Sequence, residues 1–325
     1  MKRKQILKIS LLVPVYNVST VIEEVLTSIK KQDYPIHEII IIDNHSLDNS
    51  VDLIKKFIKQ NKKLPIKLIE QKKTYGISTS YNLGVKLSKG DYVVSLHSDS
   101  VLPSSREVTK LVKPFLNDPE VIATYPYVVH LRKTWLTYNF WQKCLFGTVF
   151  GTESPSLNGK FDCYKKSAYL KVDGYDEKKF NSAIGTEDAD MHFRLKQQGK
   201  VIDTNARVIH VHGFEKNYSL RDWIARRKFL AVSYGRYVTM HARNMKFDII
   251  FFLIKPFLVV VTLLGFLYPL FFIPILAFPF IYFRKMFTDK AALSNVRIVL
   301  LPFILIFLNF YETYWFIYSI IVKRK

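Results

Sequence analysis

The chain has 325 residues, enough for one large domain or two modest ones, and its longest apolar runs follow position 248. Its formal net charge of +21 does not indicate nucleic-acid binding, because the Lys and Arg residues are scattered and the tail is hydrophobic; attraction to anionic lipid head groups is the simpler explanation. The two cysteines, Cys144 and Cys163, lack CxxC or His-rich spacing, which excludes a disulfide framework and a structural zinc site and fits a reducing cytoplasm.

From Ile9 to Asp99, apolar segments alternate with segments of helical periodicity. The first apolar segment is only five residues long, too short for a signal-peptide core, so we expect the N-terminal domain to stay where it is made. The alternation is typical of βαβ units and predicts an α/β domain with a mostly parallel sheet. The predicted strands are 9–13, 38–42, 66–69 and 92–96, and the predicted helices are 20–31, 48–60 and 78–88.

Polar residues follow three of these strands. They are Pro14 to Asn17, Asp43 to Asp48, and His97 to Asp99. Because the carboxyl ends of parallel strands meet at one edge of a sheet, we expect a ligand cleft there. Asp99 is the most informative of these residues, because a bare carboxylate after a buried strand is where such sheets place a metal or a nucleotide phosphate.

The sequence between about Pro126 and Tyr164 is irregular and aromatic, which indicates a long insertion that lines or covers the cleft. A helix is predicted to begin at Glu187, with Thr186 as its N-cap and three acidic residues in its first turn. Two short strands are then expected near Val201 and Val208.

The C-terminal third has the composition of a membrane-associated region. Residues 219–237 form a basic helical pattern interleaved with aromatic side chains, as in a helix that lies at a membrane interface. Residues 249–283 and 298–322 are apolar runs long enough to cross a bilayer. The first run fits one tilted span or a tight hairpin, and the last segment could be re-entrant; a soluble protein with a buried helix pair is the alternative.

These patterns predict three regions. They are an α/β domain with the expected ligand cleft at 1–218, a basic amphipathic interfacial region at 219–247, and membrane segments at 248–325. We therefore expect a cell-membrane protein, multi-pass or anchored, whose α/β domain faces the cytoplasm and which contacts membrane lipids.

Four motifs in this order resemble those of family 2 glycosyltransferases, which use nucleotide sugars and have a GT-A fold, a Rossmann-like α/β architecture. The matching stretches are Leu12 to Asn17, Ile40 to Ser50, Gly76 to Asp99, and Gly185 to Asp190 followed by Arg194. The joint match spans roughly residues 9–213 and is specific, whereas any one motif alone is weak.

The resemblance implies a nucleotide pocket at the sheet edge. Its residues would be Pro14, Tyr16, Asn17, Asp43, His97 and Ser98. Asp43 would accept hydrogen bonds from the base, because a carboxylate can accept from the N–H groups of uracil or guanine. Asp43 and Asp48 could instead be a turn residue and the N-cap of the next helix.

The resemblance also implies a divalent metal, Mn²⁺ or Mg²⁺, held by Asp99 against the donor diphosphate. The first acidic position of the family's metal motif is here His97, which suits Mn²⁺ better or could contact the diphosphate directly. His210 and His212 match a position of further metal or diphosphate contacts, and His210 fits slightly better. Asp99 could alternatively be a structural residue that initiates a helix.

Asp188 matches the catalytic base of the family. Such a base takes a proton from the acceptor hydroxyl as that oxygen attacks the anomeric carbon, and the attack inverts the configuration of that carbon. Its neighbours Glu187 and Asp190 could line the acceptor or diphosphate region, or merely complement the helix dipole, and Arg194 could pair with Asp190 at i+4.

The basic helix adds a further expectation. Arg226 and Arg227 lie where chain-polymerising members of the family have a Gln-x-x-Arg-Trp signature. That signature is absent from this sequence, which favours addition of a single sugar.

Together these features predict an inverting glycosyltransferase that moves one sugar from a UDP- or GDP-type donor to a lipid-linked, polyprenyl-type acceptor in glycan biosynthesis. Synthesis of a polyprenyl-phosphate sugar is the alternative enzyme function. A degenerate glycosyltransferase-fold scaffold is the non-enzymatic alternative, suggested by His97 and opposed by the presence of both Asp99 and Asp188.

Overall fold

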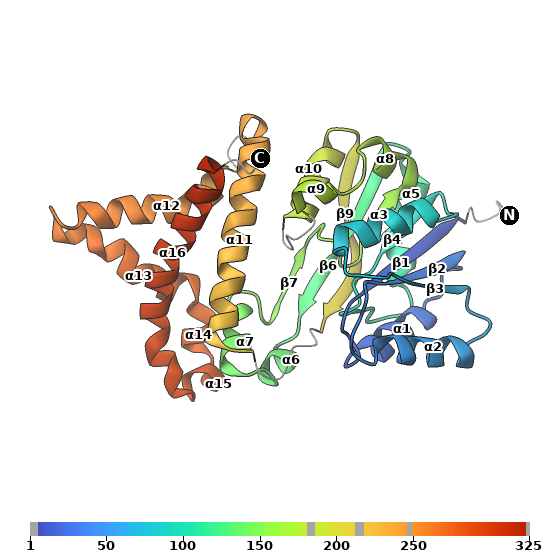
Figure 1. Ribbon diagram of the computed structural model, residues 1–325, viewed down its shortest axis with the longest axis horizontal. Coiled ribbons are helices and arrows are strands. Elements are labelled where there is room, and N and C mark those ends of the chain that lie inside the picture. The colour runs from blue at the N-terminus through green and yellow to red at the C-terminus, as the bar shows by residue number, and fades with distance from the viewer. Residues whose placement is uncertain (1–5, 181–185, 212–217, 246–248, 323–325) are drawn as a thin grey trace. The chain divides into compact units, whose positions relative to one another are not determined.

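The computed structural model describes residues 6–180, 186–211, 218–245 and 249–322. The chain divides into two compact units (Figure 1). The first unit contains residues 1–131, 151–182 and 187–213, and the second contains 132–150, 183–186 and 214–325. The sequence alone grouped residues 132–150 with the first unit, whereas the structure packs them with the C-terminal helices, because their aromatic side chains belong to that apolar core.

The first unit contains all the strands of the described residues. They are β1 (Ile9–Val15), β2 (Glu38–Asp43), β3 (Ile66–Glu70), β4 (Tyr92–Ser95), β5 (Ser100–Val101), β6 (Val121–His130), β7 (Thr152–Pro155), β8 (Cys163–Lys165) and β9 (Lys200–His210). Its helices are α1 (Ile22–Lys30), α2 (Ser50–Gln60), α3 (Ile77–Leu87), α4 (Glu107–Val112), α5 (Pro114–Asn117), α8 (Lys166–Lys171), α9 (Glu177–Phe180) and α10 (Glu187–Lys196).

The strands form one mixed sheet in the order β3-β2-β1-β4-β8-β6-β9-β5, with β7 paired to β6. The N-terminal strands β3, β2, β1 and β4 are parallel, as the βαβ pattern predicts. Strand β8 is antiparallel to both β4 and β6, and β5 is antiparallel to β9. The α/β prediction is therefore confirmed, and the second half of the sheet adds antiparallel pairs that the alternation did not reveal.

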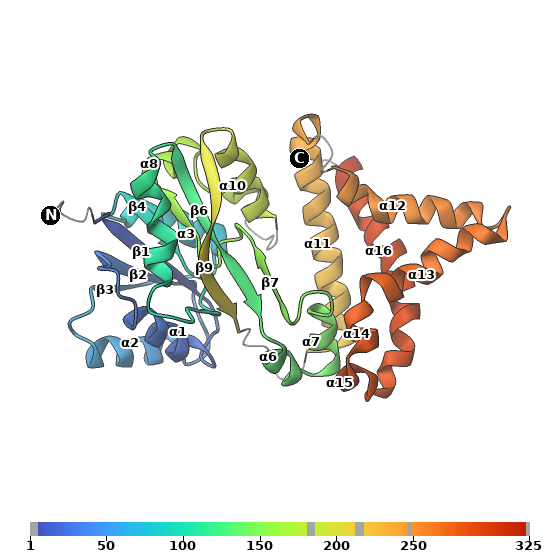
Figure 2. The same ribbon diagram turned by 180° about the vertical axis from the view of Figure 1, so that it is seen from behind.

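Helices cover both faces of this sheet, as Figures 1 and 2 show. Along β1, Leu11 and Val13 point into a core shared with α1 and α2, whereas Leu12 points into a core shared with α3 and α10. This alternation is what a strand buried on both faces requires. The two cores fix the strands so that their carboxyl ends present the polar loops at one edge.

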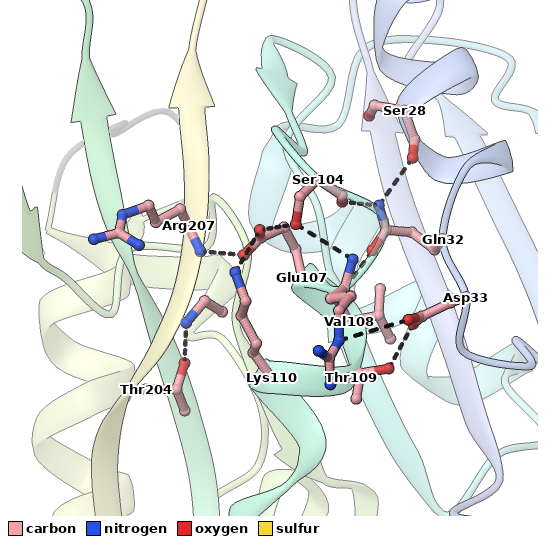
Figure 3. A network of polar contacts seen from close by, with 12 residues as sticks. Ser28, Gln32, Asp33, Ser104, Glu107, Val108, Thr109, Lys110, Thr204 and Arg207 are labelled. Atoms are coloured by element: carbon pink, nitrogen blue, oxygen red, sulfur yellow. Dashed lines mark hydrogen bonds and ion pairs between the residues drawn. The ribbon is translucent and has the colours of Figure 1, made fainter.

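A buried glutamate ties α4 to the sheet (Figure 3). Glu107 is only 1% exposed, and its carboxylate accepts hydrogen bonds from the Lys110 ammonium at 2.8 Å and from the Arg207 backbone N–H of β9 at 2.7 Å. The Ser104 hydroxyl also donates to it, at 2.5 Å. These bonds satisfy the buried charge, so this network is structural.

The prediction of two short strands near Val201 and Val208 was wrong, because one strand, β9, runs from Lys200 to His210. The structure instead has an irregularity in the β6–β9 register, where the Thr204 hydroxyl donates to the Tyr125 carbonyl and accepts from the Ala206 N–H. The side-chain bonds of Thr204 thus replace ladder bonds without ending the strand.

The second unit is helical over its described residues. Its elements are α6 (Arg132–Leu136), α7 (Phe140–Leu145), α11 (Leu220–His241), η1 (Ala242–Asn244), α12 (Ile249–Leu264), η2 (Pro269–Phe272), α13 (Ile273–Tyr282), α14 (Arg284–Thr288), α15 (Lys290–Leu293), η3 (Val296–Leu300) and α16 (Leu301–Ile321). Helix α11 packs closely on α16: a Cβ placed at Gly235 would lie 2.6 Å from the Phe316 carbonyl oxygen. The basic helix therefore has a helical partner along its length.

One described helix, Val296–Ile321, is long and apolar enough to cross a membrane. The run 249–283 is divided into the shorter helices α12 and α13, which pack on each other as in the hairpin alternative. Many apolar side chains of these two helices are exposed, including Phe257 at 66% and Ile281 at 70%. Length and composition alone indicate membrane association only weakly, because the core helix of a soluble protein can meet the same criteria.

Candidate active site

The loops after β1 and β2 are cross-linked at the sheet edge. Asn17 has a left-handed backbone with φ of 50°, its side-chain oxygen accepts from the Leu47 N–H at 2.8 Å, and its own N–H donates to the Ser46 hydroxyl at 3.0 Å. The Ser46 N–H in turn lies 3.1 and 3.3 Å from the two carboxylate oxygens of Asp43. Pro14 and Asp43 are the last or next-to-last residues of neighbouring strands. The structure thus brings these predicted nucleotide-pocket residues together, with Tyr16 exposed beside them.

Asp48 is a second link between these loops. Its carboxylate accepts from the Ser19 N–H at 2.9 Å and from the Ser50 N–H at 3.0 Å. Burial acts to raise the pKa of Asp48, but hydrogen bonds from Ser50 and Ser19 outweigh it and lower that pKa. The N-cap of α2 is Asn49, so the N-cap alternative for Asp48 was wrong by one residue.

Asp99 lies between two imidazoles. Its carboxylate is 3.2 Å from Nε2 of His210 and 3.6 Å from Nδ1 of His97. Strand β5 explains the first contact, because Ser100 pairs with His210 in the β5–β9 ladder. Burial lowers the pKa of His210, although the Asp99 charge acts in the opposite direction. The ring of His130, at the end of β6, meets the His210 ring edge-on at 5.3 Å between centroids.

A loop within the 126–164 insertion completes this edge, and the sequence analysis named none of its residues as site residues. The Asp162 carboxylate accepts from the Gly159 N–H at 2.5 Å and from the Tyr164 hydroxyl at 3.1 Å, and the Tyr81 hydroxyl donates to the Gly159 carbonyl at 2.9 Å. Asp162 is fully buried, and its other oxygen, Oδ1, has no hydrogen-bond partner among the described residues. Burial raises the pKa of Asp162 to about 7, the bonds from Gly159 and Tyr164 oppose this, and the charge of Asp188 adds to it.

Asp188 lies in the first turn of α10, partly buried, and accepts from the Ala189 N–H at 2.8 Å. Burial is the main cause that raises the pKa of Asp188 to about 7; the charge of Glu187 raises it further, and the Lys160 ammonium acts to lower it. A carboxyl group with a pKa near neutrality is suited to accept a proton at physiological pH. Asp188, Asp162 and Lys160 therefore form one electrostatic group.

Two predicted residues of the same helix have different surroundings. Glu187 is buried. Asp190 is fully buried and its carboxylate pairs with the Arg194 guanidinium at 2.6 and 2.9 Å, as the i+4 spacing predicts.

The remaining predicted residues have different placements. Arg226 and Arg227 belong to α11 in the second unit, where the Arg227 guanidinium pairs with the Glu312 carboxylate at 2.5 and 3.0 Å and Arg226 lies over the Phe229 ring. Ser98 is buried beside Asp99. His212 lies outside the described residues.

The donor atoms near Asp99 fit a divalent ion in part. Among the described ranges, no group of three or more His, Cys, Asp or Glu side chains is arranged to hold a metal ion. Asp99 and His210 nevertheless place a carboxylate and an imidazole side by side, and an ion held by few protein ligands takes its other ligands from substrate phosphates and water. These two residues would hold such an ion.

The sequence contained one signal for the missed loop. Asn158-Gly159 is a turn dipeptide. Gly159 has a φ of +73°, and a Cβ there would lie 3.5 Å from His97 Nε2. The signal marks the turn but not the burial of Asp162, which depends on β8 lying beside β4.

Comparisons with known proteins agree with this architecture. The profile of the family described as Glycosyl transferase family 2 matches residues 10–172, and that of Glycosyl transferase family group 2 matches residues 92–317. Glycosyltransferase GlyG of Streptococcus pneumoniae is 29% identical over 35% of this chain and 37% of its own length. Poly-beta-1,6-N-acetyl-D-glucosamine synthase of Staphylococcus epidermidis is 26% identical over 60% of this chain and 47% of its own. The chain thus spans less than half the length of these curated relatives.

Solved structures show the same fold. The mannosyltransferase PcManGT of Pyrobaculum calidifontis, determined with GDP-Man and Mn²⁺, is 17% identical with a TM-score of 0.59, and the alignment covers 98% of this chain and 89% of that chain. GalNAc-T7, determined with UDP, GalNAc and Mn²⁺, is 16% identical with a TM-score of 0.52, covering 71% and 51%. At these identities the likeness supports the GT-A-type fold alone.

Proposed function

The chain belongs to glycosyl transferase family 2, and from that premise we propose that it is an inverting glycosyltransferase that transfers one sugar from a nucleotide-diphosphate donor to a polyprenyl-linked acceptor at the cytoplasmic face of the cell membrane. The observation that carries the proposal is the partly buried Asp188, whose pKa is raised to about 7 in the unit that also contains Asp43 and Asp99. GDP-Man bound to the structural neighbour PcManGT supports a nucleotide-sugar donor.

In this proposal each cluster of the first unit has one task. The base of the nucleotide lies in the pocket of Pro14, Tyr16, Asn17 and Asp43, where the Asp43 carboxylate accepts from its N–H groups. The donor diphosphate lies along His97, Ser98 and Asp99. Asp99 and His210 would hold Mn²⁺ or Mg²⁺, which neutralises charge on the leaving diphosphate when it is bound.

The proton transfer falls to Asp188. Its ionised carboxylate takes the proton of the acceptor hydroxyl while that oxygen attacks the anomeric carbon from the face opposite the nucleotide. The bond to the diphosphate breaks in the same step, so the anomeric carbon is inverted and no covalent enzyme intermediate forms.

The proposal of a lipid-linked acceptor is based on the apolar surface of the second unit. Its exposed apolar helices α12 and α13, together with the candidate span Val296–Ile321, favour a substrate that is itself anchored in lipid. The curated relatives include a polysaccharide synthase by name, so the number of sugars added needs a direct measurement.

The test is transfer by the full chain in detergent. Radiolabelled UDP- and GDP-sugars are offered with polyprenyl phosphate, with a polyprenyl-diphosphate-linked glycan, and with water-soluble glycans, and the products are counted by mass spectrometry. We expect one sugar on the lipid-linked glycan. Transfer to polyprenyl phosphate itself would favour the synthase alternative, and full-rate transfer to soluble glycans would exclude the lipid-linked acceptor.

The same preparation tests the non-enzymatic alternative. Calorimetric titration with UDP and with GDP, each with and without Mn²⁺, should give binding of one nucleotide that Asp99→Ala weakens. Binding of neither nucleotide would overturn the transferase proposal in favour of a degenerate scaffold.

A further inference from the structure

Lys160 is held at the candidate site by its backbone. Its carbonyl accepts from the His97 N–H at 3.1 Å, and its own N–H donates to the Asn158 side-chain oxygen at 3.3 Å. The preceding Gly159 is fixed by the Tyr81 hydroxyl and the Asp162 carboxylate. The loop that bears Lys160 is therefore joined directly to the segment His97–Asp99.

The Lys160 side chain is partly buried. Within the described part of the chain, its ammonium forms no hydrogen bond or ion pair. Its charge nevertheless reaches two carboxyl groups from different elements, since it acts to lower the pKa values of Asp188 and Asp162. A cation that is partly removed from water and has no direct counter-ion is stabilised when an anionic ligand binds beside it.

The neighbouring charges identify that ligand. At the position where the family resemblance places an acidic metal ligand, this chain has His97. The sheet edge therefore offers a metal ion one carboxylate fewer than the family pattern does. A leaving diphosphate gains negative charge as its bond to the sugar breaks, and positively charged donors stabilise it. A lysine ammonium binds phosphate as a compact point charge with three donors.

We propose that Lys160 binds the diphosphate of the nucleotide-sugar donor. This inference rests on the proposed function and adds a residue and a contact to it. It assigns a role to a lysine whose turn is hydrogen-bonded to His97, beside Asp99, and whose charge acts on Asp188. In the transfer step the Lys160 side chain stabilises the departing diphosphate while Asp188 accepts the acceptor proton.

The test compares nucleotide affinities of full-chain variants in detergent. Calorimetry gives the dissociation constants for UDP and GDP, in EDTA and again with Mn²⁺, and ligand-observed nuclear magnetic resonance gives those for uridine and guanosine. The variants are Lys160→Met and Lys160→Arg, and Lys56→Met on the exposed face of α2 is the matched control.

We expect Lys160→Met to weaken binding of the preferred nucleoside diphosphate about ten- to a hundredfold in EDTA, the loss typical of one charge-assisted contact. Its affinity for the nucleoside should change less than about twofold, because the nucleoside lacks the diphosphate. Lys160→Arg should recover most of the affinity, and Lys56→Met should match the wild type.

The outcomes separate the two proposals. Unchanged diphosphate affinity in Lys160→Met, or an equal loss of diphosphate and nucleoside affinity, would overturn the role of Lys160 while the wild type still binds its nucleotide. If the wild type bound neither diphosphate, the proposed function would fail, and the role of Lys160 with it. A melting temperature of Lys160→Arg equal to that of the wild type confirms that the loop is intact.

Discussion

At the scale of single residues, two neighbouring carboxyl groups have unusual protonation. Asp188 and Asp162 both have pKa values raised to about 7, in each case chiefly by burial. Asp188 lies at the start of a helix, and Asp162 lies under a loop whose N–H it binds. Buried acids with perturbed pKa values are typical of functional sites, so each has a consequence that can be measured separately.

The pH dependence of transfer should follow Asp188. A general base must be ionised, so kcat/KM should fall as pH drops below about 7 and should reach a plateau above it. Asp188→Asn should lower kcat/KM by about 10²- to 10⁴-fold at pH 8 and leave nucleotide affinity within about twofold. A pH–rate profile with an acid limb below pH 5 would contradict this assignment.

Glu187→Gln is the matched variant for that profile. The charge of Glu187 raises the pKa of Asp188, so its removal should move the acid limb of the profile to lower pH while the plateau rate stays similar. A large loss of rate at every pH would show instead that Glu187 contacts substrate.

Asp162 should affect stability in a pH-dependent way. Its folded-state pKa lies above its unfolded value, so the folded protein keeps a proton that the unfolded chain releases, and the free energy of unfolding falls as pH rises from about 4 to about 7. The shift of about three pKa units sets an upper bound of about 4 kcal/mol. Asp162→Asn should therefore melt at a higher temperature than the wild type at pH 8.

The neutral amide suits that site, because its oxygen can accept from Gly159 and its NH₂ group can occupy the position of the unpartnered Oδ1. At pH 5 the variant should exceed the melting temperature of the wild type by a smaller margin than at pH 8. Asp52→Asn, on the exposed surface of α2, is the control and should melt at the wild-type temperature at each of the two pH values. Destabilisation of Asp162→Asn at pH 8 would mean that the Asp162 charge is compensated in the fold.

At the scale of elements, periodicity predicted what local pattern can determine. The strands and helices between Ile9 and Ser95 lie within two residues of their predicted ends, because each has an apolar period that matches its buried face. Residues 126–164 could not be assigned, since α6 has five residues and depends on distant packing such as the stacking of Trp135 on Phe150. Tertiary contacts, not propensity, define such elements.

The candidate site also contains residues that the sequence predicted and residues that it did not. Motif spacing identified Asp99 and Asp188, and the fold brings Asp99 to His210 across the β5–β9 pair. Lys160 and Asp162 lie outside those motifs. Their role depends on β8 lying beside β4, where Ser95 and Asp162 exchange hydrogen bonds, and no local pattern in the sequence indicates that pairing.

Helix packing in the second unit centres on a buried charge. The Glu312 carboxylate of α16 pairs with the Arg227 guanidinium of α11 and with the Lys255 ammonium of α12. Glu312→Ala leaves two cations without their partner, so we expect it to lower the free energy of unfolding by roughly 3–5 kcal/mol and to reduce recovery of monodisperse protein in detergent.

Arg132→Ala is the matched control for that prediction. It removes an ion pair with Asp289 whose arginine is 49% exposed, and should cost less than about 1 kcal/mol. Thermal unfolding followed by size-exclusion chromatography compares the two variants. Equal and small effects would show that Glu312 does not hold α11, α12 and α16 together.

At the scale of the whole molecule, exposed apolar surface and positive charge occur in one chain. The exposed side chains of α12 and α13 and the span Val296–Ile321 would bury apolar area in a bilayer, and the net charge of +21 would attract anionic lipid. We expect the full chain to remain in the membrane pellet after extraction with 1 M salt and with alkaline carbonate. Release by salt alone would indicate electrostatic attachment without insertion.

Sheet order also has a consequence for how the protein is made. Strand β9 is paired between β6 and β5, although it is the last strand to be synthesised, and His210 at its end follows Asp99 by 111 residues. At about 5–20 residues per second, a ribosome needs roughly 5–20 s to add that segment. During that interval β5 and β6 lack their neighbour, and an unpaired strand edge invites pairing with other chains. The nascent protein is therefore most vulnerable to aggregation shortly before its candidate active site can assemble.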